Sequence, residues 1–171
     1  HKSRKAAEQA SSWIAKKLKT GHDPVGIGGE QLVFSRAEVK LLAPVPRPGS
    51  FRDFSINETH MSKADVPFKK TEQWYTTPPY YKGNCDTITG TDDPVPFPYY
   101  TARLDLELEL GIIIGKKGSN LRLDEAKEYN AGYTILVDAS CRDGYNREPF
   151  GPTKRKDFCT PMGPCLVTAD A

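Results

Sequence analysis

The chain has 171 residues, which is enough for one domain with a sizeable core. Its 24 Lys and Arg residues nearly balance 22 Asp and Glu residues, and the formal net charge of +2 gives no global field that would gather nucleic acid or anionic lipid. The longest apolar run, Ile112 to Ile114, is far shorter than the ~18 residues of a membrane span. We therefore expect neither a nucleic-acid partner nor a membrane partner.

The first forty residues predict one helix followed by loops. Residues Ser3 to Leu18 favour a helix with a mostly apolar stripe that ends near Gly21. Glycine and proline then dominate up to Glu30, and short strands are expected at 32–34 and 39–42, the second of them stopped by prolines. We assign residues 1–38 to this helix and its connecting segment, and residues 39–171 to the main domain.

The strongest strand pattern is the alternation of apolar and acidic residues from Leu104 to Leu110. It passes into the run 111–115, which is expected to be buried on both faces. A second buried strand, from Tyr133 to Val137, delivers Asp138 at its end. Strands and long loops after a single helix predict a β-rich α+β domain rather than alternating βαβ units.

Acidic side chains gather on one face of the first of these strands. Because residues two apart share a face, Asp105, Glu107 and Glu109 lie about 6.7 Å apart on one side and the leucines lie on the other. At an effective dielectric constant of about 20, two like charges at that spacing repel by about 2.5 kcal/mol, so a partly buried face requires a cation or basic partners. A solvated outer face of an amphipathic strand is the alternative, and the pattern leaves it open. Asp138 is likewise either a metal ligand or the cap of a turn.

The chain has four cysteines: Cys85, Cys141, Cys159 and Cys165. They form no CxxC pair and do not have the spacing of a zinc finger. We interpret them as free thiols of an intracellular, cytoplasmic protein.

Several motifs occur together in one order along the chain: Phe51-Arg52-Asp53-Phe54, Glu58-Thr59-His60, Tyr80 to Asn84, Leu104 to Gly115, Asp138 to Asp143, and Gly151-Pro152 through Lys156-Asp157-Phe158. Their order resembles the fumarylacetoacetate hydrolase family. The resemblance covers Val39 to Thr168, and the acidic strand combined with the later segments makes it specific.

The resemblance implies a site and a fold. The family's divalent cation, Mg²⁺ with Mn²⁺ or Ca²⁺ as alternatives, would be held by residues that match Asp53, Glu107, Glu109 and Asp138, whereas Asp105 does not match a usual ligand. The general base matches His60, a substrate-binding tyrosine matches Tyr81, and anion-stabilising or substrate-binding residues match Arg142 and Lys156. The implied fold is a mixed β-roll, usually in a homodimer.

The implied activity is metal-dependent cleavage of a C–C bond in a 1,3-diketo acid or 2-oxo acid, with the cation stabilising the enolate and His60 activating water. Decarboxylation of an oxaloacetate-like acid and keto–enol isomerisation would use the same site. Family domains continue beyond the segment matched by Gly163 to Thr168, so we expect a truncated domain or one completed by a second chain. A catalytically silent metal-binding or interaction module is the alternative to an enzyme.

Overall fold

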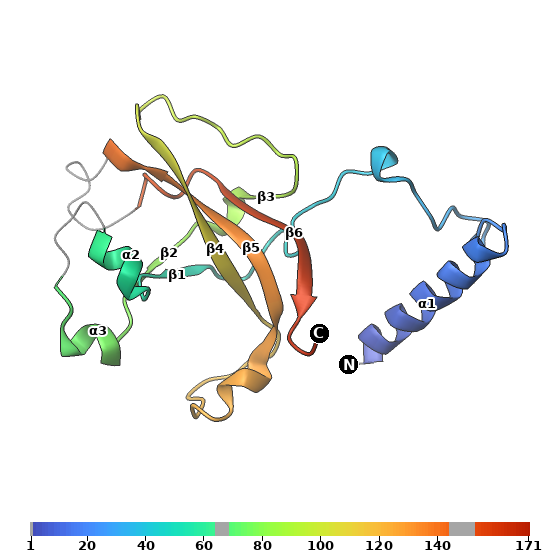
Figure 1. Ribbon diagram of the computed structural model, residues 1–171, viewed down its shortest axis with the longest axis horizontal. Coiled ribbons are helices and arrows are strands. Elements are labelled where there is room, and N and C mark those ends of the chain that lie inside the picture. The colour runs from blue at the N-terminus through green and yellow to red at the C-terminus, as the bar shows by residue number, and fades with distance from the viewer. Residues whose placement is uncertain (1, 64–68, 144–152) are drawn as a thin grey trace. The chain divides into compact units, whose positions relative to one another are not determined.

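The structure is a computed structural model that describes residues 2–63, 69–143 and 153–171. The chain divides into two compact units, residues 1–40 and residues 41–171, and each is described by itself. Helices and strands are numbered in chain order (Figure 1).

The first unit consists of one long helix and a short connecting segment. Helix α1 spans Lys2–Lys19, so the predicted helix is confirmed. Three lysines in its last turn favour the negative end of the helix dipole, and Gly21 follows with a φ of 74°. The expected strand at 32–34 is wrong, because the structure has only an isolated bridge between Val25 and Gln31. A 3₁₀ turn, η1, follows at Arg36–Glu38.

The second unit contains a two-stranded and a four-stranded sheet. Strands β1 (Arg52–Phe54) and β2 (Tyr80–Lys82) pair antiparallel. The larger sheet has the order β3-β6-β5-β4, in which β3 (Ile88–Thr89) is parallel to β6 (Thr160–Thr168) and the other pairs are antiparallel. Its two longest strands are β4 (Leu104–Ile114) and β5 (Asn130–Cys141). This mixed sheet confirms the predicted β-rich α+β class.

Short helical turns connect these strands. They are α2 (Glu58–Lys63), α3 (Glu72–Thr76), η2 (Cys85–Thr87) and η3 (Ala126–Tyr129). The side chain of Thr71 caps α3 by accepting a hydrogen bond from the N–H of Trp74, whose indole N–H donates to the carbonyl of Ser55 at 2.8 Å. This bond ties α3 to the segment between β1 and α2, and so helps to hold α2 in place.

The strand expected at 39–42 is wrong as well. This segment pairs with no strand in the described part of the chain, and it leads to Ala43, which is buried. The core consists of Ala43, Leu136 and Met162, with Ile88, Ile113 and other partly buried side chains packed against them. The segment is therefore anchored where it ends, by the packing of Ala43 in the core.

The two faces of β4 have opposite environments. Glu107, Glu109 and Ile113 point to the covered side, where they share a face with Leu136 and Asp138 of β5. The other side is open, and Leu108 there is 78% exposed. The solvated acidic face considered from the sequence is thus excluded. The expectation that residues 111–115 are buried on both faces is also wrong, since Ile112 and Ile114 are exposed.

Candidate metal and catalytic site

Three carboxylates from three strands converge on the covered face. Asp53 of β1, Glu109 of β4 and Asp138 of β5 each offer an oxygen atom, and these atoms lie within 4.8 Å of one another. Asp138 is the most enclosed, with a side chain that is 2% exposed. The sheet register accounts for part of this geometry, because Asp138 pairs directly with Glu107, two residues from Glu109.

The proximity of these carboxylates changes their acidity. Burial, together with the charges of Asp53 and Asp138, raises the pKa of Glu109 to about 8. Burial also raises the pKa of Asp138 to about 6, although Lys156 acts in the opposite direction. The pKa of the Tyr81 hydroxyl is raised by burial and by the charges of Asp138 and Asp53, so this hydroxyl keeps its proton and donates it in a hydrogen bond to Asp53. The site therefore gathers more negative charge than its surroundings neutralise.

Glu107 has a different environment, because two basic side chains hold it. Arg142 donates through Nη2 to its Oε1 atom, and Lys156 donates through Nζ to its Oε2 atom at 2.9 Å. Burial by itself would raise the pKa of Glu107, but the hydrogen bond from Arg142 and the charge of Lys156 lower it to about 2. Glu107 is thus ionised throughout the physiological range, in contrast to Glu109 two residues away.

Lys156 connects the strands that build the site. Its ammonium group binds Glu107 and Asp138 and lies 5.5 Å from the centre of the Tyr81 ring. Burial alone would lower the pKa of Lys156, but the charges of Asp138 and Glu107 raise it. Lys156 therefore remains a cation placed between the two carboxylates that face each other across β4 and β5.

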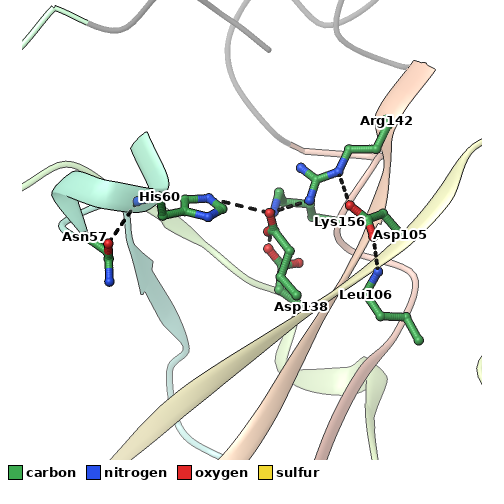
Figure 2. Close-up of polar contacts among 8 residues, drawn as sticks. Asn57, His60, Asp105, Leu106, Asp138, Arg142 and Lys156 are labelled. Carbon is green, nitrogen blue, oxygen red and sulfur yellow. Dashed lines mark hydrogen bonds and ion pairs between the residues drawn. The ribbon is translucent and has the colours of Figure 1, made fainter. Parts of the chain in front are cut away.

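His60 enters the site from helix α2. Its Nε2 atom lies 3.6 Å from Glu107 Oε1, and the side chain of Asn57 accepts a hydrogen bond from the backbone N–H of His60 at 2.9 Å (Figure 2). Glu58 does not serve His60, because its carboxylate binds Lys70 and Tyr75 instead. The carboxylate that lies beside the imidazole is therefore that of Glu107 on the sheet and not that of the nearby glutamate in its own helix.

The residues of this site fit a divalent cation. The donors are carboxylate oxygens, which suit Mg²⁺, Mn²⁺ and Ca²⁺. The Oδ2 atom of Asp53 is buried and has no hydrogen-bond partner in the described part of the chain, a situation that costs free energy unless a cation satisfies the atom. Asp53, Glu109 and Asp138 would hold the cation, and Glu107, the fourth predicted ligand, lies beside them with its two oxygens bound by Arg142 and Lys156.

The predicted site residues thus lie together, with distinctions that the sequence did not reveal. Asp53, Glu109 and Asp138 form one cluster, and His60, Arg142 and Lys156 all contact Glu107. Asp105, which does not match a usual ligand of the family, binds Arg142 (Figure 2). Sequence reasoning assigned no role to Asn57, although its position three residues before His60 is a helix-capping signal. The predicted motif residues Gly151 and Pro152 lie outside the described residues.

Comparisons with known proteins cover most of the second unit, residues 41–171. The family model described as fumarylacetoacetate (FAA) hydrolase C-terminal matches residues 52–171. An alignment of 148 residues that covers 84% of this chain gives 32% identity to "Oxaloacetate tautomerase fahd2, mitochondrial" of Xenopus laevis. An alignment of 171 residues, gaps included, that covers 94% of this chain gives 33% identity to "Oxaloacetate tautomerase YisK" of Bacillus subtilis.

The fold is also similar to solved structures. One is a 5-carboxymethyl-2-hydroxymuconate delta-isomerase from Mycobacterium smegmatis, with a TM-score of 0.63, 27% sequence identity, and coverage of 79% of this chain and 52% of that chain. The chain likewise spans only 44% of the Xenopus relative and 51% of the Bacillus relative. The predicted β-roll is thus confirmed as an incomplete version of the fold. Among the described residues, no helix is both long and apolar enough to cross a membrane.

Proposed function

Because this chain belongs to the fumarylacetoacetate hydrolase family, we propose that it is part of a divalent-cation-dependent enzyme that interconverts the keto and enol forms of a 2-oxo acid such as oxaloacetate. The observation that supports this most strongly is the convergence of Asp53, Glu109 and Asp138 beside an ionised Glu107 and a histidine. The names of the Xenopus and Bacillus relatives favour tautomerisation as the reaction and oxaloacetate as the substrate.

The cation and the basic residues divide the work of binding. A cation held by the three carboxylates supplies a Lewis acid for the oxygen atoms of a 2-oxo acid. Mg²⁺ is the predicted ion, with Mn²⁺ or Ca²⁺ as alternatives. Arg142 and Lys156 supply positive charge beside Glu107, where an anionic substrate needs it. The Tyr81 hydroxyl keeps its proton and so remains a hydrogen-bond donor next to the cation ligands.

His60 is the proposed proton carrier. In the keto-to-enol direction its Nε2 atom takes a proton from the carbon next to the keto group, and the keto oxygen gains a proton from solvent. Glu107 Oε1, 3.6 Å away, stabilises the imidazolium formed. Because the pKa of Glu107 is about 2, its carboxylate keeps its charge and does not compete with His60 for the proton.

Hydrolysis of a C–C bond is a second candidate, favoured by the same histidine. A base that abstracts a proton from carbon can also take one from water and direct hydroxide at a carbonyl group, as predicted for a 1,3-diketo acid, of which an acylpyruvate is an example. More than half of the His60 side chain is exposed, so water can reach it. Decarboxylation of oxaloacetate requires the same cation site and is distinguished by its product.

The test uses the full-length protein with Mn²⁺ or Mg²⁺. Keto–enol exchange of oxaloacetate is followed by ultraviolet absorbance, pyruvate release is measured in the same sample, and acylpyruvate cleavage is assayed in parallel. We expect cation-dependent exchange that is faster than either other reaction. Cation binding without turnover of any of these substrates would contradict the proposed enzyme and support the silent module.

The proposed enzyme is a homodimer. The open face of β4 continues onto β5 and β6 as a patch of exposed apolar side chains: Leu106, Leu108, Leu110, Ile112, Ile114, Tyr133, Ile135 and Val167. Such a patch is large for a free surface and supports burial against other polypeptide. Light scattering of the full-length protein tests the dimer, and a monomer would contradict it. The cytoplasmic location stays a prediction, because the Xenopus relative is named as mitochondrial.

A further inference from the structure

Asp105 stands outside the cation cluster, yet both of its carboxylate oxygens are fixed. Its Oδ1 atom accepts a hydrogen bond from the backbone N–H of Leu106 at 2.9 Å, and its Oδ2 atom accepts one from Arg142 Nε at 2.8 Å (Figure 2). About half of the Asp105 side chain is exposed, so water alone could solvate this carboxylate. Its fixed geometry is therefore not explained by a need to satisfy a buried charge.

Arg142 is held at its backbone as well as at its side chain. Its backbone N–H donates to the carbonyl of Arg103 at 2.8 Å, just before β4 begins. The neighbouring Asp143 accepts hydrogen bonds from the Thr101 hydroxyl and from the backbone N–H of Ala102. The end of β5 is thereby tied to the start of β4, and the guanidinium group has a fixed starting point.

The guanidinium group bridges two carboxylates of β4. Nε binds Asp105 and Nη2 binds Glu107, and the side chains of Arg142 and Glu107 are both largely buried. A planar guanidinium fixes the relative orientation of two such partners, which a lysine ammonium does not do. The contact with Asp105 therefore helps to fix where Nη2 meets Glu107.

We propose that Asp105 is a positioning residue that acts through Arg142 to fix the carboxylate of Glu107 beside the cation cluster. This inference rests on the proposed function, because the cation cluster and the His60 contact with Glu107 give that orientation its effect. When Asp105 no longer fixes the guanidinium, Glu107 and Arg142 reorient together and cation affinity falls. Partners that orient the residues of metal sites typically change affinity by about 10- to 100-fold, and Asp105 is one step further away.

Mn²⁺ affinity of the full-length protein, measured by calorimetry, gives the first test. We expect Asp105→Leu to weaken binding about 10- to 30-fold, and Asp105→Asn to weaken it about 3-fold because the amide oxygen still accepts from Arg142. Asp105→Glu keeps the charge but displaces it, so a loss of affinity is expected here too. The matched control is Asp124→Asn, which removes a 2.8 Å ion pair with Arg122 away from the site and should leave affinity unchanged.

A double-mutant cycle with Arg142→Lys separates positioning from a general charge effect. If Asp105 acts through the guanidinium, Asp105→Leu adds less than about 2-fold in the Arg142→Lys background. Equal losses in Asp105→Asn and Asp105→Leu that persist in that background and disappear at high salt would show a long-range charge effect and overturn the inference.

A second measurement does not depend on the cation. In NMR spectra, comparison with Arg142→Lys identifies the Nε–H resonance of Arg142. In the wild-type protein this resonance should be separated from those of exposed arginines, and its proton should be protected from exchange with solvent. Asp105→Leu should lose that protection. Unchanged protection would overturn the positioning role. A wild-type protein that shows this protection but fails to bind Mn²⁺ would instead contradict the proposed function.

Discussion

On β4, the face with Glu107 and Glu109 is covered by other parts of the chain, whereas the face with Leu108 and Leu110 is open. A strand of a globular domain usually buries its leucines and exposes its carboxylates. Here the covered carboxylates come with compensating groups: Arg142 and Lys156 bind Glu107, and Glu109 belongs to a cluster that fits a cation. The contrast indicates that this strand is built around a binding site and that its apolar face packs against a further layer of polypeptide.

The largest expected effect comes from substituting one residue on each face. Glu109→Gln removes a charged oxygen donor from the cluster, so Mn²⁺ affinity should fall by at least about 100-fold and turnover should be lost with it. Leu110 follows Glu109 in the chain and lies on the open face of β4, so Leu110→Gln should leave Mn²⁺ affinity unchanged. Calorimetry of both variants checks the contrast, and equal affinities would remove the distinction between the faces.

His60→Ala sharpens the comparison by separating chemistry from cation binding on the covered face. We expect turnover of oxaloacetate to fall about 10²- to 10⁴-fold, because a general base is lost. Mn²⁺ affinity should stay within about 2-fold, because His60 supplies no atom to the carboxylate cluster and Arg142 and Lys156 still hold Glu107 in its absence. Thr59→Ala on the same helix is the control. Near-normal turnover in His60→Ala would refute the general-base role even if the cation site stands.

Stability provides a third contrast, in the 171-residue chain. Leu136 shares the covered face and is 4% exposed, so Leu136→Ala should lower the free energy of unfolding by about 2–5 kcal/mol. Leu108 is 78% exposed, so Leu108→Ala should change it by less than about 0.5 kcal/mol. Urea denaturation measures both values. A large loss for Leu108→Ala would show that its side is already covered in this chain, for example by self-association.

The last contrast is a pH dependence that distinguishes Glu107 from Glu109. In the cation-free protein the pKa of Glu109 is raised from 4.5 to about 8, so the folded state holds a proton that the unfolded state releases. The stability contributed by this group is present below pH 4.5 and is lost as pH rises through 8. The pKa of Glu107 is lowered to about 2, so its contribution is present above pH 4.5 and is lost as pH falls through 2.

Two measurements check these signs. Glu109→Gln should flatten the decline in stability between pH 6 and pH 8, whereas wild-type Mn²⁺ affinity should rise by up to about 10-fold per pH unit over that range, because binding displaces a proton. An Mn²⁺ affinity that is constant from pH 6 to pH 8 would show that Glu109 is already ionised without a cation.

The sequence predicted helix α1, strand β4, the middle of β5 and the family, but it missed strand β6 and could not predict which face of β4 is covered. The alternation along β4 located that strand, and the ordered motifs identified the family, which the match to residues 52–171 confirms. Alternation has the same period whichever face is buried, so the pattern could not decide between a solvated and a covered acidic face. That choice depends on Asp53 and Lys156, which only the fold brings beside β4.

The errors at 32–34 and 39–42 have a related cause. Both segments contain β-favouring residues, but a strand also needs a partner, and the structure supplies only one bridge at Gln31 and a packing contact at Ala43. The sequence did not reveal the role of Asp105, because its partner, Arg142, directly follows the end of another strand, β5. Local propensity and motif spacing contain no information on such long-range contacts.

The central claim is that the covered face of β4, together with Asp53 and Asp138, holds one divalent cation. Crystals of the full-length protein soaked in Mn²⁺ and measured at the manganese absorption edge would test it most directly. We predict one strong anomalous peak in contact with oxygen atoms of Asp53, Glu109 and Asp138. A saturated crystal with Mn²⁺ bound elsewhere, and with these three carboxylates left without a cation, would contradict the claim.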